Sequence, residues 1–149
     1  MHNKIFPPTA KRVQMSTDCS ANNDIRNCTV NSIQIHKDAS AELQNKRICE
    51  LDHEWDVERV LGTSAGALVL LTSLLGLRRS KMFLLTGVVG FFMLQHAIQG
   101  CCPPLALLRK MGVRTAEEIF QEKTALKLAR GDFDAKPTDA AEMLKAAEK

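Results

Sequence analysis

"VLGTSAGALVLLTSLLGL", residues 60–77, decides the fold, because it is eighteen residues long and carries no charged side chain. At a rise of ~1.5 Å per residue, a helix of this length reaches roughly 27 Å, close to the ~30 Å hydrocarbon core of a bilayer. A basic turn, "RRSK" at 78–81, separates it from residues 82–100, which also lack a formal charge and would span about 28 Å. We therefore predict an all-α integral membrane protein built on a two-span transmembrane helical hairpin.

Two buried helices of a soluble bundle are the alternative interpretation of these apolar runs. Such helices carry a polar stripe along their whole length, because one face meets water. Neither run has such a stripe, and the polar residues Gln95, His96 and Gln99 gather only near one end of the second run. The hydropathy of both runs therefore favours a hairpin embedded in the lipid bilayer.

The charge of the chain is modest and its hydrophobicity is unevenly distributed. The 149 residues have a formal net charge of +3, which argues against the strongly basic face of a protein that binds nucleic acid. Hydrophobic residues concentrate between 57 and 108, whereas the first fifty residues are polar. The start, "MHNKIFPPTA", has no apolar core of seven or more residues, so we expect no cleavable signal peptide and assign membrane insertion to the later runs.

The whole chain divides into three predicted parts. Residues 1–37 are polar and aperiodic, so we expect them to be poorly ordered. Residues 38–134 form the predicted membrane domain, and residues 135–149 form a short, fraying tail helix. The elements expected within the membrane domain are an amphipathic lead-in helix at 38–59, a span at 60–77, a turn at 78–81, a span at 82–100 and a helix at 115–130.

Both helices that flank the predicted hairpin have local sequence signals. The lead-in helix contains no glycine or proline and places Ile48, Leu51 and Trp55 on one apolar face. Thr115 and Glu118 form a capping box at the start of the last helix, and Gly131 is placed to end it. This last helix is expected to be cytoplasmic, packed against the lead-in helix, or to lie at the membrane interface.

Basic residues near the span ends predict the orientation of the hairpin. Within fifteen residues of the spans, the side of the termini carries Lys46, Arg47, Arg59, Arg109, Lys110 and Arg114. The turn carries Arg78, Arg79 and Lys81. Six basic groups against three favour cytoplasmic termini by the positive-inside rule.

Small residues form a stripe on each predicted span. Gly62, Gly66, Ser73 and Gly76 lie on one side of the first helix, and the first two form a G-x-x-x-G pair. The second span has Gly87 and Gly90 on one face. Small residues let helix backbones approach closely in lipid, so each stripe is expected to pack against a helix. The partner is either the other arm of the hairpin or another chain, and we favour a homo-oligomer.

The end of the second span combines histidine, glutamine and cysteine side chains. On a helix, Cys101 and Cys102 lie about 140° and 120° from His96 in opposite senses, and no second ligand pair completes a tetrahedral zinc site. We therefore predict no metal and no cofactor. Gln95, His96 and Gln99 share one sector near interfacial water, where a hydrogen-bonding or anchoring role is expected.

The cysteines leave one alternative function open. Five cysteines without a C-x-x-C pair argue against a disulfide framework and favour reduced thiols. The vicinal pair Cys101 and Cys102 suits a thiol-based redox or sulfur-relay protein, provided that one thiolate is accessible and activated. The chain contains no G-x-S-x-G, phosphate-loop or H-E-x-x-H motif, so the main hypothesis is a non-enzymatic hairpin protein.

Residues around the sole tryptophan have structural explanations. Trp55 precedes the first span, where an aromatic belt is expected. The carboxylates around it, Asp52, Glu54, Asp56 and Glu58, are interpreted as a solvated or salt-bridged helix face and not as an acid–base site.

Three pieces of sequence carry a family resemblance. They are E-W-D-x-E-R at 54–59, Q-H-A-x-Q-G-x-C-P-P-L at 95–105 and R-T-x-x-E-I at 114–119. Together they resemble bacterial proteins with the YgaP-like inner-membrane transmembrane domain, over about residues 50–134. The resemblance implies a two-span hairpin in the bacterial inner membrane, in a family of unknown function.

Some relatives join this domain to a rhodanese sulfurtransferase, whose active cysteine lies in a C-x-x-G-x-R type loop. No cysteine of this chain has such surroundings, so the activity is not carried over, and a sulfurtransferase enters only as a candidate partner. Cys101 stands where the family pattern is expected to have tryptophan or another bulky residue. This departure weakens the inference of a shared role for the vicinal cysteines.

Overall fold

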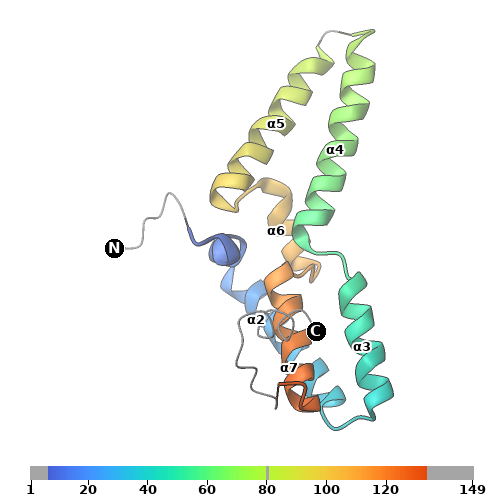
Figure 1. The fold of residues 1–149 in the computed structure, drawn as a ribbon. Coiled ribbons are helices and arrows are strands. Elements are labelled where there is room, and N and C mark those ends of the chain that lie inside the picture. The colour runs from blue at the N-terminus through green and yellow to red at the C-terminus, as the bar shows by residue number, and fades with distance from the viewer. Residues whose placement is uncertain (1–6, 80, 134–149) are drawn as a thin grey trace, which may run out of the picture.

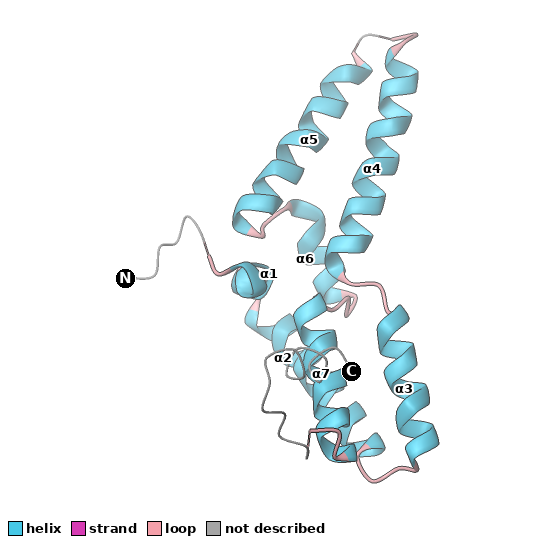
Figure 2. Cartoon of the chain, in the orientation of Figure 1, coloured by secondary structure: helices cyan, strands magenta, loops and turns pink. Residues whose placement is uncertain are grey.

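A computed structural model describes residues 7–79 and 81–133, and this part of the chain is helical, without strands (Figure 2). The elements are η1 (Thr9–Lys11), α1 (Arg12–Met15), α2 (Cys19–His36), α3 (Ala41–His53), α4 (Val57–Gly76), α5 (Met82–Gln99), α6 (Pro103–Lys110) and α7 (Ala116–Arg130). Helices α4 and α5 form a long hairpin, and the other elements gather beyond its open end (Figure 1). We call these other elements the basal unit.

The hairpin has the dimensions and exposure of a membrane-spanning pair. Segments long and apolar enough to cross a membrane lie within residues 41–76 and 82–99, and only 17% and 6% of their apolar windows are buried inside the protein. Core helices of a soluble protein are mostly buried, whereas these helices expose leucine and phenylalanine over most of their surface. The predicted all-helical fold with two spans is confirmed.

The two arms touch near the closed end of the hairpin. The hydroxyl groups of Thr72 and Thr86 lie 2.7 Å apart and share a hydrogen bond between the arms. Gly76 faces the ring of Phe83, which would lie 2.9 Å from a Cβ atom added at that glycine. From this contact the arms diverge toward the basal unit (Figure 1).

The predicted lead-in helix over 38–59 is divided in two. Helix α3 ends at His53, and Glu54 adopts an extended conformation with φ −66° and ψ 135°. A new helix then starts because the Asp56 carboxylate accepts a hydrogen bond from the backbone N–H of Arg59 at 2.7 Å. The backbone N–H of Val57 donates to a carbonyl of a distant loop, at Arg114, at 2.9 Å. The first span is therefore a separate helix with its own N-cap.

The described part of residues 1–37 is ordered, which contradicts the prediction of a poorly ordered segment. Helix α2 has eighteen residues but buries only Ala21 and Ile25 among its apolar side chains. Its polar side chains contact the rest of the basal unit instead; Asn22 accepts a hydrogen bond from Arg109 at 2.8 Å, and Ser32 donates to Glu122 at 2.6 Å. A helix held by polar contacts leaves little apolar periodicity in the sequence.

The prolines that end the second span also begin a helix. Gly100 closes α5 in the left-handed conformation, with φ 70°, and Pro103 and Pro104 occupy the first two positions of α6. The sequence predicts the interruption at these residues but not the helix that follows it. The predicted tail helix at 135–149 lies outside the described residues.

Helix α7 forms as the sequence predicts. The hydroxyl of Thr115 accepts from the backbone N–H of Glu118 at 3.2 Å, and the carboxylate of Glu118 accepts from the backbone N–H of Thr115 at 2.8 Å. Gly131 ends the helix with φ 86°. Helix α7 packs on α3 and α2, so it belongs to the basal unit. This packing agrees with the predicted placement of the helix against the lead-in helix.

Two apolar clusters hold the basal unit together and join it to the hairpin. The joint cluster contains Val13, Val57, Leu61, Cys102 and Leu105. The second cluster lies between α3 and α7 and contains Ile48, Leu51, Ile119 and Leu126. Ile48 and Leu51 of the predicted apolar face thus pack on α7, whereas Trp55 lies beyond the end of α3 and is exposed.

Candidate functional site

Charged side chains gather where the hairpin meets the basal unit. The first group is an ion-pair cluster between α1, α4 and α5. One carboxylate oxygen of Glu58 accepts from the guanidinium of Arg12 at 2.7 Å, and the other lies 3.1 Å from Nε2 of His96. Three helices far apart in the sequence are therefore linked through one carboxylate at the start of the first span.

His96 is the buried member of the predicted polar sector. It is 2% exposed, and its second ring nitrogen, Nδ1, has no hydrogen-bond partner. Gln99 is exposed and contributes its backbone carbonyl, which accepts from the hydroxyl of Ser16 at 3.1 Å, while Gln95 is half-buried. Within the predicted sector, the clear side-chain contact is therefore that of His96 with Glu58.

The N-terminal helix α1 lies directly on Gly100. A Cβ atom at this position would lie 2.6 Å from the carbonyl carbon of Arg12, so a larger residue cannot fit without displacing α1. The positive φ of 70° independently favours glycine. Residue 100 thus has two separate reasons to be glycine, the turn that it makes and the helix that it contacts.

The vicinal cysteines have different surroundings. Cys102 is buried in the joint cluster beside Val57 and Leu105, whereas Cys101 is exposed. Burial raises the pKa of the Cys102 thiol above its ordinary value, which disfavours the thiolate. Among the described residues there is no group of three or more histidine, cysteine, aspartate or glutamate side chains that could hold a metal ion. The two thiols therefore differ in their exposure to solvent.

The second charged group centres on Arg109, which is 1% exposed. Its guanidinium donates to both carboxylate oxygens of Glu118 at 2.7 Å, and also to Asn22 at 2.8 Å and to the carbonyl of Val113 at 3.1 Å. Burial alone would raise the pKa of Glu118, but the hydrogen bonds from Arg109 and Thr115 outweigh it and lower that pKa. The capping carboxylate of α7 thus also anchors α6.

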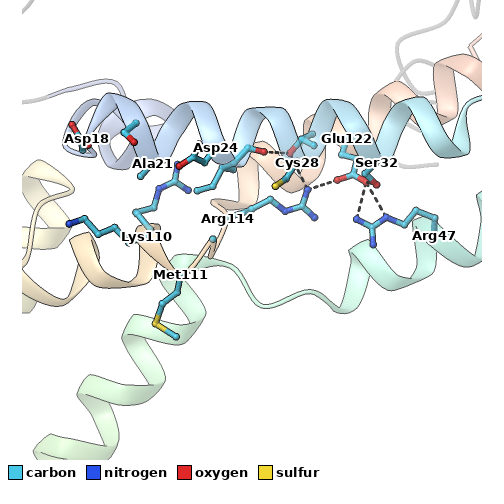
Figure 3. A pocket seen from close by; sticks show the side chains of 15 residues that line it. Asp18, Ala21, Asp24, Cys28, Ser32, Arg47, Lys110, Met111, Arg114 and Glu122 are labelled. Atoms are coloured by element: carbon cyan, nitrogen blue, oxygen red, sulfur yellow. Dashed lines mark hydrogen bonds and ion pairs between the residues drawn. The ribbon is translucent and has the colours of Figure 1, made fainter.

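The third charged group links α3, α2 and α7 through Glu122 (Figure 3). This side chain is fully buried, and one of its oxygens accepts from Ser32 at 2.6 Å and from the guanidinium of Arg47 at 2.9 and 3.0 Å. The other oxygen accepts from Arg114, which also pairs with Glu54. Burial opposes the charge of Glu122, but the bonds from Ser32, Arg114 and Arg47 outweigh it and lower the pKa.

Arg114 connects this group to the hairpin. Burial disfavours its charged form, but hydrogen bonds to Glu54 and Glu122 more than compensate, so its pKa is raised. A cavity of about 410 Å³ lies beside Arg114, between α2 and the loop that joins α6 to α7 (Figure 3). Carboxylates already engage the buried guanidinium groups of Arg109 and Arg114 along its wall. These charges hold helices together.

The carboxylates near Trp55 have structural roles, in line with the sequence interpretation. Glu54 and Glu58 pair with Arg114 and Arg12, and Asp56 caps α4. Asp52 pairs with Lys123 and Trp55 receives the guanidinium of Arg59 at 4.6 Å from its ring centre. The sequence did not reveal the basic partners, which lie up to 71 residues away.

The small-residue stripes lie outside the contact between the two arms, apart from one position. A Cβ atom added at Gly62, Gly66, Gly87 or Gly90 would meet no atom within 4 Å. Gly76 packs on the other arm, and the remaining predicted position, Ser73, is half-buried. The four open glycines are thus left on the surface of the hairpin.

Comparison with known proteins identifies the membrane part of this chain. Residues 56–118 match the family described as "Inner membrane protein YgaP-like, transmembrane domain". No curated protein and no solved structure matches the chain. The matched range begins at the N-cap of α4, includes the hairpin and the vicinal cysteines, and ends at the capping carboxylate of α7. Over residues 56–118 the chain is therefore similar to the YgaP-like inner-membrane transmembrane domain, and this range contains both helices of the hairpin.

Proposed function

We propose that the protein is a non-enzymatic membrane scaffold, which holds the basal unit at the cytoplasmic face of the inner membrane and self-associates through its hairpin. The four open glycines carry this proposal, because they lie on the lipid-facing surface and are not used between the arms. In lipid, helix association comes from close packing, and small residues permit the closest approach.

Two ion pairs at the start of α4 support the scaffold part of the proposal. The pairs of Glu58 with Arg12 and of Glu54 with Arg114 connect the start of α4 to α1 and to the loop before α7. The pair of Arg114 with Glu54 is partly buried, and breaking it would leave the buried Arg114 guanidinium with one carboxylate partner fewer. The pair of Arg12 with Glu58 is more exposed and contributes less. A basal unit held in this way keeps a defined orientation relative to the bilayer.

Self-association is tested by substitution of Gly66, with Leu71 as the matched control. Gly66→Ile fills the open face of α4, whereas Leu71→Ile changes a lipid-facing residue on the opposite side of the same helix. We expect weaker cross-linking in liposomes for G66I and an unchanged result for L71I. Equal cross-linking of all three proteins refutes self-association through this face.

Orientation is tested with tags at both ends of the full chain in sealed proteoliposomes. The excess of basic residues beside the basal unit supports cytoplasmic termini. A protease added on the side that corresponds to the cytoplasm should remove both tags. Protection of both tags, or of one tag alone, contradicts the proposed orientation.

The thiol-relay alternative rests on the exposure of Cys101 beside a second cysteine. The raised pKa of Cys102 weighs against it, because a relay needs two thiols that exchange readily. A sulfurtransferase would be the natural partner of such a relay. The labelling experiment in the Discussion distinguishes the two functions.

A further inference from the structure

A cavity opens between the two arms of the hairpin, on the side of the basal unit. It has a volume of about 340 Å³ and is bounded by Ala65 and Leu68 on α4, by Phe92 on α5 and by Cys102 and Pro103 below. Its side walls belong to the two spans, whereas its floor is the start of α6. The cavity therefore lies in the leaflet on the side of the basal unit.

The lining of this cavity is uncharged and has no free hydrogen-bond donor in its walls. Ser64 supplies the one hydroxyl among the lining residues, and that hydroxyl donates to the backbone carbonyls of Val60 and Leu61 within its own helix. Burial raises the pKa of the thiol on the floor, Cys102, so it too is neutral. Such a lining suits an occupant without charge or hydrogen-bonding groups.

The cavity is continuous with the lipid-facing surface of the hairpin. Leu68 lines it and is also 41% exposed. Since the spans are surrounded by hydrocarbon, a lipid chain reaches the opening without leaving the bilayer. An empty space of this size would also forfeit dispersion contacts along its walls. An apolar cavity of ~150 Å³ already admits benzene, so there is room here for several methylene groups.

We propose that this cavity binds one acyl chain of a phospholipid from the leaflet on the side of the basal unit. A helix or side chain of a second copy is the competing occupant. The open glycines on which the proposed self-association rests, Gly62, Gly66, Gly87 and Gly90, are not part of the lining. The lipid cavity and the self-association surface are therefore separate features of the hairpin.

The test uses the full chain in liposomes that contain brominated phosphatidylcholine, which quenches tryptophan on contact. In a Trp55→Phe background, Phe92→Trp places a probe at the cavity, and Phe91→Trp places a matched probe on the exposed outer face. We expect both probes to be quenched. A third substitution, Ala65→Leu, fills the cavity and should reduce quenching of the F92W probe while leaving that of F91W unchanged.

Two results would overturn the proposal. If the F92W probe is not quenched, another protein segment fills the cavity. If A65L leaves the quenching of F92W unchanged or alters both probes equally, the probe reports only general contact with lipid. Helix content is measured for each variant by circular dichroism. Where A65L lowers it, Ala65→Val replaces that substitution, because it adds less volume to the same cavity and is judged by the same two results.

Discussion

The ionic contacts of Glu122 give the sharpest test of how the basal unit is held. Glu122→Gln keeps the size of the side chain but removes a fully buried charge that three side chains share. Removing one partner from a buried ion pair costs ~3–5 kcal/mol, because the remaining charge is left unpaired. Here Arg114 retains Glu54 as a second partner, so the lower end of that range, about 3 kcal/mol, is expected.

This loss is measured by amide hydrogen exchange of the full chain in detergent micelles. Exchange of the protected amides in α3 and α7 reports local opening, and every ~1.4 kcal/mol is a tenfold change in that equilibrium. A loss of about 3 kcal/mol therefore predicts exchange faster by roughly a hundredfold in these two helices. The hairpin amides, which do not depend on Glu122, should keep their wild-type rates.

Glu117→Gln is the matched control, because Glu117 lies on the same helix and accepts an exposed hydrogen bond from Gln121 at 3.1 Å. Partly exposed contacts of this kind contribute less than about 1 kcal/mol. If E122Q and E117Q have the same exchange rates in α3 and α7, the buried charge of Glu122 does not hold the basal unit together, contrary to this prediction.

Three further predictions concern the contact of Gly100 with α1, the vicinal cysteines and the carboxylates of α7. Gly100→Ala should displace α1 from its contact with residue 100 and speed proteolysis of α1. Gly112 also has a positive φ, 84°, but open space around it, so Gly112→Ala should show only the ~1–3 kcal/mol cost of backbone strain. Equal effects of the two substitutions would contradict the close contact of Gly100 with Arg12. In variants that keep a single cysteine, a water-soluble maleimide should label the exposed Cys101 readily near pH 7. It should label Cys102 slowly, because that thiol is buried and its pKa is raised. Rapid labelling of Cys102 would instead favour the thiol relay. Folding lowers the pKa of both Glu118 and Glu122 below the ordinary value of about 4.5. Their contribution to stability should therefore be complete above about pH 4.5 and be lost as the pH falls through their folded pKa values. If the thermal unfolding temperature of the basal unit is the same at pH 6 and pH 3, these ion pairs do not contribute to its stability.

Features set by neighbouring residues could be predicted from the sequence. The charge-free runs at 60–77 and 82–100 predict the hairpin because length and hydropathy alone decide membrane insertion. The start of α7 was predicted because a capping box depends on residues only three positions apart, Thr115 and Glu118.

Features set by tertiary contacts could not be predicted in the same way. Helix α2 depends on polar contacts with Arg109 and Glu122, about ninety positions away. The prolines at 103 and 104 indicate a break by local rules, yet they are equally suited to the first turn of a helix, where they stand. The contact of His96 with Glu58 joins two spans, so helical geometry within one span did not reveal it.

The interruption at residues 54–56 determines how mechanical force passes between the two parts of the molecule. A continuous helix would transmit rotation and axial displacement from α3 to α4 as a rigid rod, but extended backbone at Glu54 transmits neither efficiently. The alternative route is Arg114, whose carbonyl accepts from the N–H of Val57 and whose side chain binds Glu54 and Glu122. A pull on α7 should therefore reach the start of the first span through the contacts of Arg114, in addition to the contacts that α7 makes with α3.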